Sequence, residues 1–182
     1  MKKTLLVIAA MFALVLSANA QAKFGVQGAM NLAKMANGGS GESILSWQAG
    51  VVLDYDFQSN LYLSTGALYT VDGQTVANTK QTFNYIQVPL YIGYKVNVID
   101  EDVAIFAQAG PYAGYCLGSK VGSTKNNIDG MNKLDYGASF GLGTYIANTL
   151  KVGFYYDLGI GKLFDAFDTQ NRAFRIGAAW YF

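Results

Sequence analysis

Seven charged residues lie inside stretches where apolar and polar residues alternate, and their types could perform acid–base chemistry. They are Asp54, Asp56, Lys95, Asp135, Lys151, Asp157 and Arg175. All seven fall in the phase opposite the apolar side chains, so the alternation predicts that they face a common interior. Buried charges need partners. We therefore expect the carboxylates to pair with the lysines and the arginine in a polar plug, with an acid–base group as the alternative interpretation.

Most catalytic and metal-binding arrangements are excluded because the chain has no histidine and only one cysteine, Cys116. Ser-His-Asp and Cys-His catalytic sets, histidine metal sites and an intramolecular disulfide are all ruled out. Cys116 is either a reactive thiol or, more simply, a small buried filler. The acidic residues outside the alternating stretches lack the regular spacing of a calcium loop. We expect no catalytic, cofactor-binding or metal-binding residues and no cofactor.

Eight alternating stretches predict eight β-strands. They span residues 23–32, 44–56, 61–71, 82–96, 103–117, 133–146, 150–160 and 172–182. In the last stretch Phe174, Ile176 and Trp180 alternate with Arg175 and smaller residues, and the apolar phase of all eight is predicted to carry no charge. Glycines 137, 141 and 143 are predicted to ease strand bending and make room for aromatic side chains of the interior.

An apolar face that excludes charge predicts a strand wall in contact with lipid, where a mid-bilayer Arg or Lys costs about 2–4 kcal/mol. A soluble barrel such as a lipocalin has the reverse polarity, and a secreted β-sandwich is the alternative on composition. Open sheet edges do not occur in hydrocarbon. The pattern therefore predicts an all-β fold, an eight-stranded antiparallel transmembrane barrel of the bacterial outer membrane, with outer-membrane lipid around it.

Aromatic residues at the strand ends predict two girdles at the membrane surfaces. Trp47, Tyr69, Tyr115 and Tyr136 form one, and Tyr55, Tyr94, Trp180 and Phe182 form the other. The connections are predicted to alternate in length, with long loops at 33–43, 72–81, 118–132 and 161–171 and short turns at 58–60, 97–102 and 147–149. Long loops are extracellular in such barrels, so both termini are expected in the periplasm and the loops could meet an extracellular partner.

The N-terminal residues 1–20 are predicted to be a signal peptide, because a basic start precedes an apolar run and Ala18-Asn19-Ala20. The mature domain would span 21–182, with cleavage after Ala22 and an uncleaved membrane anchor as alternatives. Loss of Lys2 and Lys3 changes 13 basic residues to 11 against 12 acidic ones, a net charge of −1. That charge argues against a nucleic-acid partner.

The terminal residues Trp180, Tyr181 and Phe182 are predicted to be an assembly signal read by the barrel-assembly machinery. We also expect the closing strand to pair with the first one.

Three stretches resemble the PorT-like outer-membrane β-barrel family of small OmpX/OmpA-type barrels. They are YIQVPLYIGYK at 85–95, AGPYAGY at 109–115, and the pair LDYG at 134–137 and YDLG at 156–159. The family often has glutamate where this chain has Gln87. The resemblance implies an integral outer-membrane barrel and adds no activity.

These observations together predict a non-enzymatic outer-membrane protein that stabilises the envelope or presents its loops to an external partner. A narrow pore for small solutes is the alternative. A membrane enzyme that acts on lipid without histidine is a further hypothesis.

Overall fold

The computed structural model describes residues 22–36, 42–57, 60–76, 78–99, 102–122, 124–125, 132–161 and 170–182. Its strands are β1 (Ala22–Ala36), β2 (Glu42–Asp56), β3 (Leu61–Val76), β4 (Thr79–Ile99), β5 (Val103–Val121), β6 (Thr124–Lys125), β7 (Leu134–Ile146), β8 (Leu150–Gly159) and β9 (Gln170–Tyr181). None of these described residues forms a helix long and apolar enough to cross a membrane.

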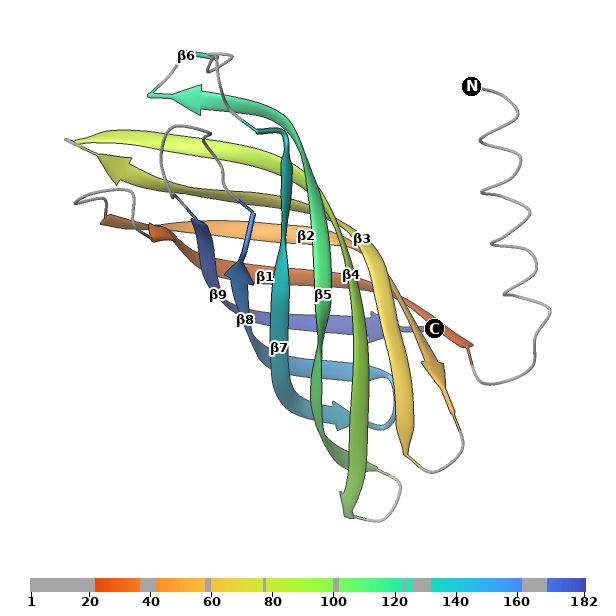
Figure 1. Ribbon diagram of the computed structural model, residues 1–182. Coiled ribbons are helices and arrows are strands. Elements are labelled where there is room, and N and C mark those ends of the chain that lie inside the picture. Colours follow the sequence, from red (N-terminus) through yellow and green to blue (C-terminus); the bar gives the residue numbers. More distant parts are fainter. Residues whose placement is uncertain are drawn as a thin grey trace.

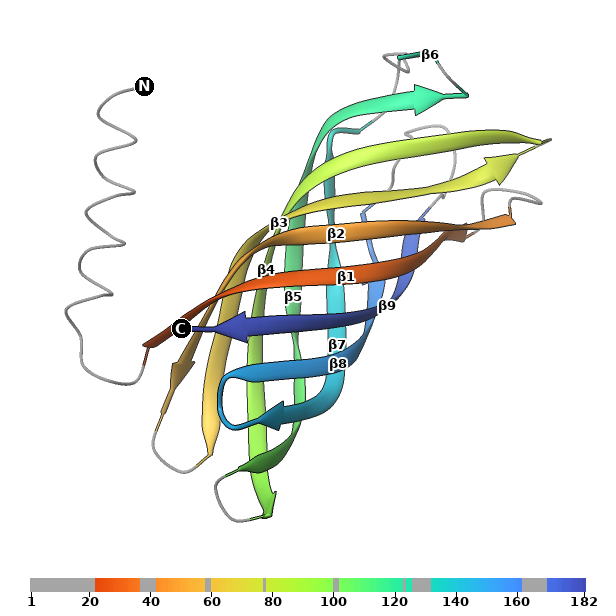
Figure 2. The same cartoon turned by 180° about the vertical axis from the view of Figure 1, so that it is seen from behind.

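Eight of the strands close into an antiparallel barrel. Their order is β4-β3-β2-β1-β9-β8-β7-β5, and β4 also pairs with β5. The first and last strands pair from Gly25↔Tyr181 to Ala36↔Gln170, and Figure 2 shows β1 beside β9. A closed sheet has no unpaired edge. The predicted fold class, including the pairing of the closing strand with the first, is confirmed.

The barrel has two different ends. The short connections after β2, β4 and β7 lie at one end with Phe182, and we call this the turn end (Figure 1). The connections after β1, β3, β5 and β8 lie at the other, the loop end. At residues 147–149 the chain turns with positive φ at Ala147 and Asn148, and Thr149 N donates to Ile146 O at 3.1 Å. This short turn is as predicted.

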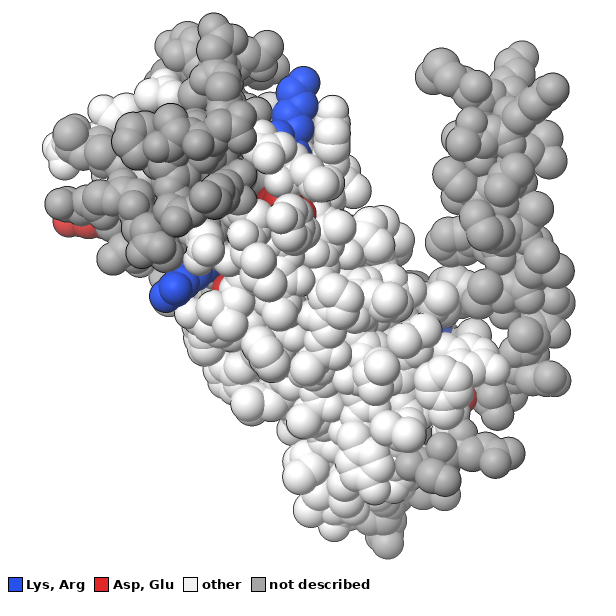
Figure 3. All heavy atoms as spheres, viewed as in Figure 1, with Lys and Arg blue, Asp and Glu red and all other residues white. Residues whose placement is uncertain are grey.

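The two faces of the wall differ as the alternation predicted. In β4, for example, Ile92 is 65% exposed whereas its neighbour Tyr91 is 7% exposed. Figure 3 shows an outer wall with almost no charged side chains, and the visible acidic and basic atoms gather near the barrel ends. The outer face is therefore apolar over most of its height.

Arg172 is an exception to the prediction that the apolar phase carries no charge. It shares the phase of Phe174 in β9 and is exposed. Its Cα partner is Leu158, one residue before the end of β8, so Arg172 lies at the loop end. There a long cationic side chain can reach the headgroup region and water.

The expected loop at 72–81 is wrong, because β3 and β4 run through it as a long hairpin. Their register continues to Val76↔Thr79, and Asn78 adopts a left-handed φ of 64°. Asp72 and Gln74 are buried on the inner face. Both residues keep the alternation of the strand. Polar residues are typical of loops, but here they face the polar interior of the barrel.

The other expected loops are shorter than predicted because the strands continue into them. β1 extends to Ala36, β2 begins at Glu42, β5 extends to Val121 and pairs with β6, and β9 begins at Gln170. The rest of these loops, 37–41, 126–131 and 162–169, lies outside the described residues, as does the expected signal peptide.

Two of the three predicted glycines of β7 make room for interior aromatic rings, whereas Gly137 faces the backbone of Leu158. A Cβ at Gly141 would lie 2.6 Å from Cδ1 of Tyr155, and one at Gly143 would lie 2.9 Å from Cε1 of Phe106. Gly93 plays the same role in β4, where a Cβ would fall 2.2 Å from the Tyr62 ring. These glycines allow the interior to hold large side chains.

The apolar wall predicts a depth-dependent penalty for charge. Leu90→Arg places a cation midway between the outward Ile86 and Tyr94 of β4, and we expect it to lower the free energy of unfolding by about 2–4 kcal/mol. Leu117→Arg, the matched control near the loop end of β5, should cost no more than about 1 kcal/mol. Urea unfolding in lipid vesicles, followed by tryptophan fluorescence, measures both. Equal penalties at the two positions would contradict a lipid-facing wall.

Candidate functional site

The inner face of the barrel holds the charged residues that the alternation placed there, and they form separate groups rather than one network. One group lies at the turn-end mouth, a second in the turn-end half of the lumen, and a third in the loop-end half. Each is built from residues of several strands.

The turn-end mouth is bridged by a half-buried ion triad. Asp56 of β2 contacts Lys95 Nζ of β4 at 2.7 Å and Lys23 Nζ of β1 at 3.0 Å. Lys23 also donates to Asn148 Oδ1 at 3.2 Å. The triad ties three strands and the 147–149 turn together across the opening.

Lys151 is fully enclosed in the turn-end half of the lumen. Its Nζ lies 3.2 Å from Asp54 Oδ2, and Tyr145 donates its hydroxyl to the same oxygen at 2.5 Å. The ammonium also lies 4.8 Å from the ring centroid of Phe106, 4.9 Å from that of Tyr62 and 5.0 Å from that of Tyr145. Such cation–π contacts strengthen where water is excluded. The desolvated ammonium is therefore held by one carboxylate and three rings.

The rings around Lys151 pack on one another and fill the cross-section. Tyr62 and Tyr145 meet edge to face with centroids 5.9 Å apart, and Phe106 and Tyr145 with centroids 5.2 Å apart. Tyr62 donates to Gln108 Oε1 of the adjacent layer at 2.8 Å. An eight-stranded barrel is only wide enough for side chains to fill it, and these rings do so.

A layer of amide and hydroxyl side chains lies next to the aromatic layer, on its loop-end side. Gln48 Nε2 donates to Thr70 Oγ1 at 2.6 Å and to Gln87 Oε1 at 2.9 Å. Gln87 Nε2 in turn donates to Asp157 Oδ2 at 2.9 Å, and Ser139 Oγ donates to Asp157 Oδ1 at 2.7 Å. Both oxygens of the buried Asp157 are thus satisfied.

Arg175 is the only buried cation of the loop-end half among the described residues. Its Nη1 contacts Asp157 Oδ2 closely, and its Nη2 lies 3.6 Å from Asp72 Oδ2. Sequence analysis placed Asp72 in a loop and so missed it as a lumen residue. The signal that could have found it is its place in the alternation, because Asp72 continues the inward phase of Tyr62, Ser64 and Thr70.

Asp135 is the one predicted network member that forms no ion pair within the described part of the chain. Asn171 Nδ2 donates to Asp135 Oδ2 at 3.4 Å, and the Tyr112 hydroxyl donates to the same oxygen at 3.5 Å. Asn171 Nδ2 also donates to Asp72 Oδ2 at 3.1 Å. A single amide group therefore bridges two buried carboxylates.

The remaining singled-out residues are the C-terminal three and Cys116, and of these Tyr181 joins the turn-end lumen group. Trp180 and Phe182 point outward, whereas Tyr181 is buried in the lumen beside Tyr145, with ring centroids 6.3 Å apart. The terminal backbone is anchored because Phe182 N donates to Phe24 O at 2.8 Å. Cys116 is buried, with its Sγ 3.6 Å from Gly118 O.

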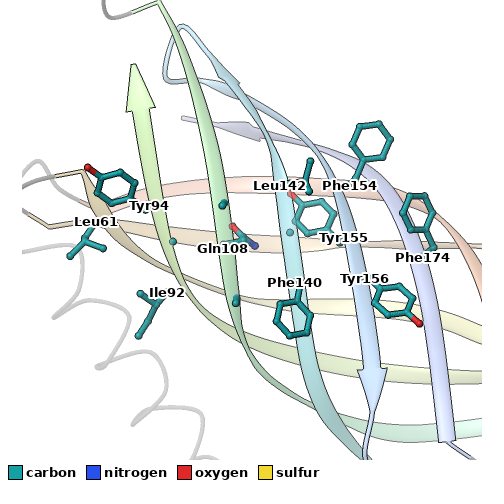
Figure 4. A pocket seen from close by; sticks show the side chains of 14 residues that line it. Leu61, Ile92, Tyr94, Gln108, Phe140, Leu142, Phe154, Tyr155, Tyr156 and Phe174 are labelled. Atoms are coloured by element: carbon teal, nitrogen blue, oxygen red, sulfur yellow. The ribbon is translucent and has the colours of Figure 1, made fainter. Parts of the chain in front are cut away.

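A shallow hollow of about 530 Å³ lies on the outer wall over β4, β5, β7 and β8. Figure 4 shows Ile92, Phe140, Phe154 and Phe174 around it. Small residues, including Ala107 and Ala109, line it between these larger side chains. No carboxylate or cation lines this hollow, so it has no acid–base chemistry to offer.

Comparison with known families and proteins gives a clear match at the family level. The family model described as "outer membrane protein beta-barrel domain" matches residues 16–165. No curated protein matches the sequence.

Several solved barrels share the fold at low sequence identity. PagL, an outer membrane enzyme, has a TM-score of 0.60 at 18% identity over 86% of this chain and 98% of PagL. Neisserial surface protein A has a TM-score of 0.57 at 15% identity over 87% and 97% of the two chains. Ail, the attachment invasion locus protein of Yersinia pestis, has a TM-score of 0.51 at 16% identity over 88% and 97%.

Breaking the buried pair should cost far more than breaking the one at the mouth. We expect Lys151→Met to lower the free energy of unfolding by about 3–5 kcal/mol, because Asp54 is left buried without its cation. Lys95→Met, the matched control, should cost about 1 kcal/mol or less, since Asp56 keeps Lys23 and is partly hydrated. Urea titration in detergent micelles measures both.

The double variant Lys151→Met/Asp54→Leu separates charge imbalance from lost packing. It removes both charges, so it should recover much of the stability lost in Lys151→Met. If the stability lost in the double variant instead equals the sum of the losses in Lys151→Met and Asp54→Leu, the two charges are not coupled. That result would contradict a buried ion pair.

Proposed function

The chain belongs to the family of outer membrane protein beta-barrel domains, and we propose that it is a non-enzymatic member that stabilises the envelope or presents its loops to an external partner. The observation that carries this proposal is the filled lumen, where side chains from opposite walls pair across the interior. Because the described lumen residues are packed against one another and their buried carboxylates and cations are mostly paired, we expect specific recognition to fall to the loop end.

We propose the following orientation and targeting. Residues 1–20 act as a signal peptide, both termini lie in the periplasm, and the connections after β1, β3, β5 and β8 face the exterior. The short turns at the end that carries Phe182 support this orientation, since periplasmic connections are short in outer-membrane barrels. The terminal Trp180, Tyr181 and Phe182 would be read by the assembly machinery before Phe182 is tied to β1.

We also assign the chain to the PorT-like type on its motifs. The stretches 85–95 and 109–115 lie in β4 and β5 and are paired with each other, with Val88↔Ala113 and Pro89↔Tyr112 as Cα partners. The resemblance is therefore carried by one continuous patch of the wall. It supports a scaffold assignment and not a chemical activity.

Three features support the absence of catalysis. The chain has no histidine. Asp54 and Asp157 are each engaged by a buried cation, and both lie in the interior, away from a lipid substrate. PagL shows that an enzyme can be built on the same fold, so the proposal depends on the residues of this chain and not on the scaffold.

The filled lumen favours this role over the pore alternative. Lys151 and its three aromatic neighbours occupy the turn-end half, and the hydrogen-bonded layer around Gln48 and Asp157 lies across the middle. A solute would have to displace a buried ion pair to pass.

The first test is electrical. In planar bilayers the intact barrel should show no conductance steps, because Lys151 and the aromatic layer block it. Insertion of the silent barrel is verified by heat-modifiable migration on a gel of the same preparation. Regular steps from the unmodified barrel would favour a pore and overturn the proposal.

The second test separates the two versions of the proposed role. Cells that lack the protein are complemented with the wild-type chain or with variants in which 37–41, 126–131 or 162–169 is replaced by a Gly-Ser linker of equal length. If the barrel acts as an envelope reinforcement, every variant should restore detergent resistance.

If the barrel acts through surface interaction, only the wild-type chain should restore adhesion to host cells or matrix, although the variants insert normally. Insertion is checked by heat-modifiable migration on a gel. If the wild-type chain restores neither detergent resistance nor adhesion, both versions of the proposed role are excluded.

A further inference from the structure

The buried charges of the loop-end half do not balance. Asp72, Asp135 and Asp157 are buried there against Arg175 alone, so this half carries −3 + 1 = −2 among the described residues. In the turn-end half the buried Asp54 and Lys151 cancel. An uncompensated buried charge is costly, so the excess of two negative charges among the described residues needs a partner from outside them.

The unpartnered atoms of the same region show what kind of partner fits. The oxygens Asp72 Oδ1, Asp135 Oδ1, Asn171 Oδ1, Gln74 Oε1 and Asn31 Oδ1 are all buried without a hydrogen-bond partner. The donors buried without a partner are Asn31 Nδ2, Arg175 Nε and the hydroxyl groups of Ser46 and Tyr85. Two of the unpartnered acceptors are carboxylate oxygens, so the net negative charge points to a positively charged ligand.

The carboxylates and amides converge on one place. The Asn171 amide bridges Asp72 of β3 and Asp135 of β7, at 3.1 and 3.4 Å from their Oδ2 atoms. A half-turn of the amide about its Cβ–Cγ bond would present Oδ1 in place of Nδ2 to an ion between these carboxylates. Asn31 is 0% exposed and lies beside Asp72, while Gln74 is two residues from Asp72 on the same inward face. Hence these side chains lie in one part of the lumen.

We propose that this region, which we call the acidic chamber (Asn31, Asp72, Gln74, Asp135 and Asn171), binds one divalent metal cation such as Ca²⁺. Carboxylate and amide oxygens are the ligands that Ca²⁺ takes, and one such ion cancels the excess of two negative charges. No group of three His, Cys, Asp or Glu side chains in the described ranges is arranged to hold a metal. Amide oxygens must therefore complete the ligand set.

Asp157 lies outside the ligand set because Ser139, Gln87 and Arg175 already engage both of its oxygens. The competing ways to offset the charge are a cationic side chain from outside the described residues, protons on the carboxyl groups and water between them. None of these gives a saturable metal signal, so metal binding can be distinguished from all three.

The experiment uses Tb³⁺ as a luminescent substitute for Ca²⁺ on the full barrel refolded in detergent micelles. Tyr112 donates to Asp135, and Tyr85 is buried in the same half of the lumen, so either phenol can sensitise a bound ion. We expect saturable tyrosine-sensitised emission that Ca²⁺ displaces. Asp135→Asn and Asp72→Asn should each weaken the apparent affinity at least tenfold.

Two matched controls are the exposed carboxylates Glu42→Gln at the loop end and Asp102→Asn at the turn end, which should leave the titration unchanged. A second readout is the urea midpoint. Calcium should raise it for the wild-type barrel and not for Asp135→Asn, which without metal should be at least as stable as the wild type. No saturable emission from the folded wild-type barrel, or emission retained in both chamber variants, overturns the proposal.

Discussion

Every polar group inside this barrel must find its partner inside the barrel, and the rest of the structure depends on that constraint. The outer wall is apolar, and the sheet closes through β1 and β9, so neither the wall nor an edge offers hydrogen bonds. The tube is only as wide as the side chains that fill it. A charge that points inward is therefore useful only where the opposite wall supplies its complement.

The pairs that satisfy this constraint also brace the barrel across its diameter. Lys151 of β8 reaches Asp54 of β2, and Asn171 of β9 reaches Asp72 of β3. These strands are not neighbours in the sheet, so each contact fixes the distance between separate parts of the wall. A buried pair is weak evidence for net stability. It does specify one arrangement of the interior, because any slip in strand register would leave a charge unpaired.

Most of the fold could be predicted because alternation with a period of two reports which face each residue occupies. The inward positions of Asp54, Lys151 and Arg175 follow from this alternation alone. The stretch 72–81 resembles a loop because it is polar, although Asp72 and Gln74 keep the inward phase of β3. Partner choice could not be predicted either. Whether Asp157 or Asp135 meets Arg175 depends on stagger and on the ring packing that glycines such as Gly141 permit.

The buried charges cancel in one half of the lumen and do not cancel in the other. In the turn-end half a single ion pair is enclosed by aromatic rings, so this half is neutral without any ligand. In the loop-end half Arg175 is shared between Asp157 and Asp72, and Asp135 has amide and phenol contacts only. If the side chains of this half served only to fill the tube, the third carboxylate, Asp135, would not be needed. Its presence near the loop end makes the loop-end half, and not the turn-end half, the part of the described interior in which buried charge is unmatched.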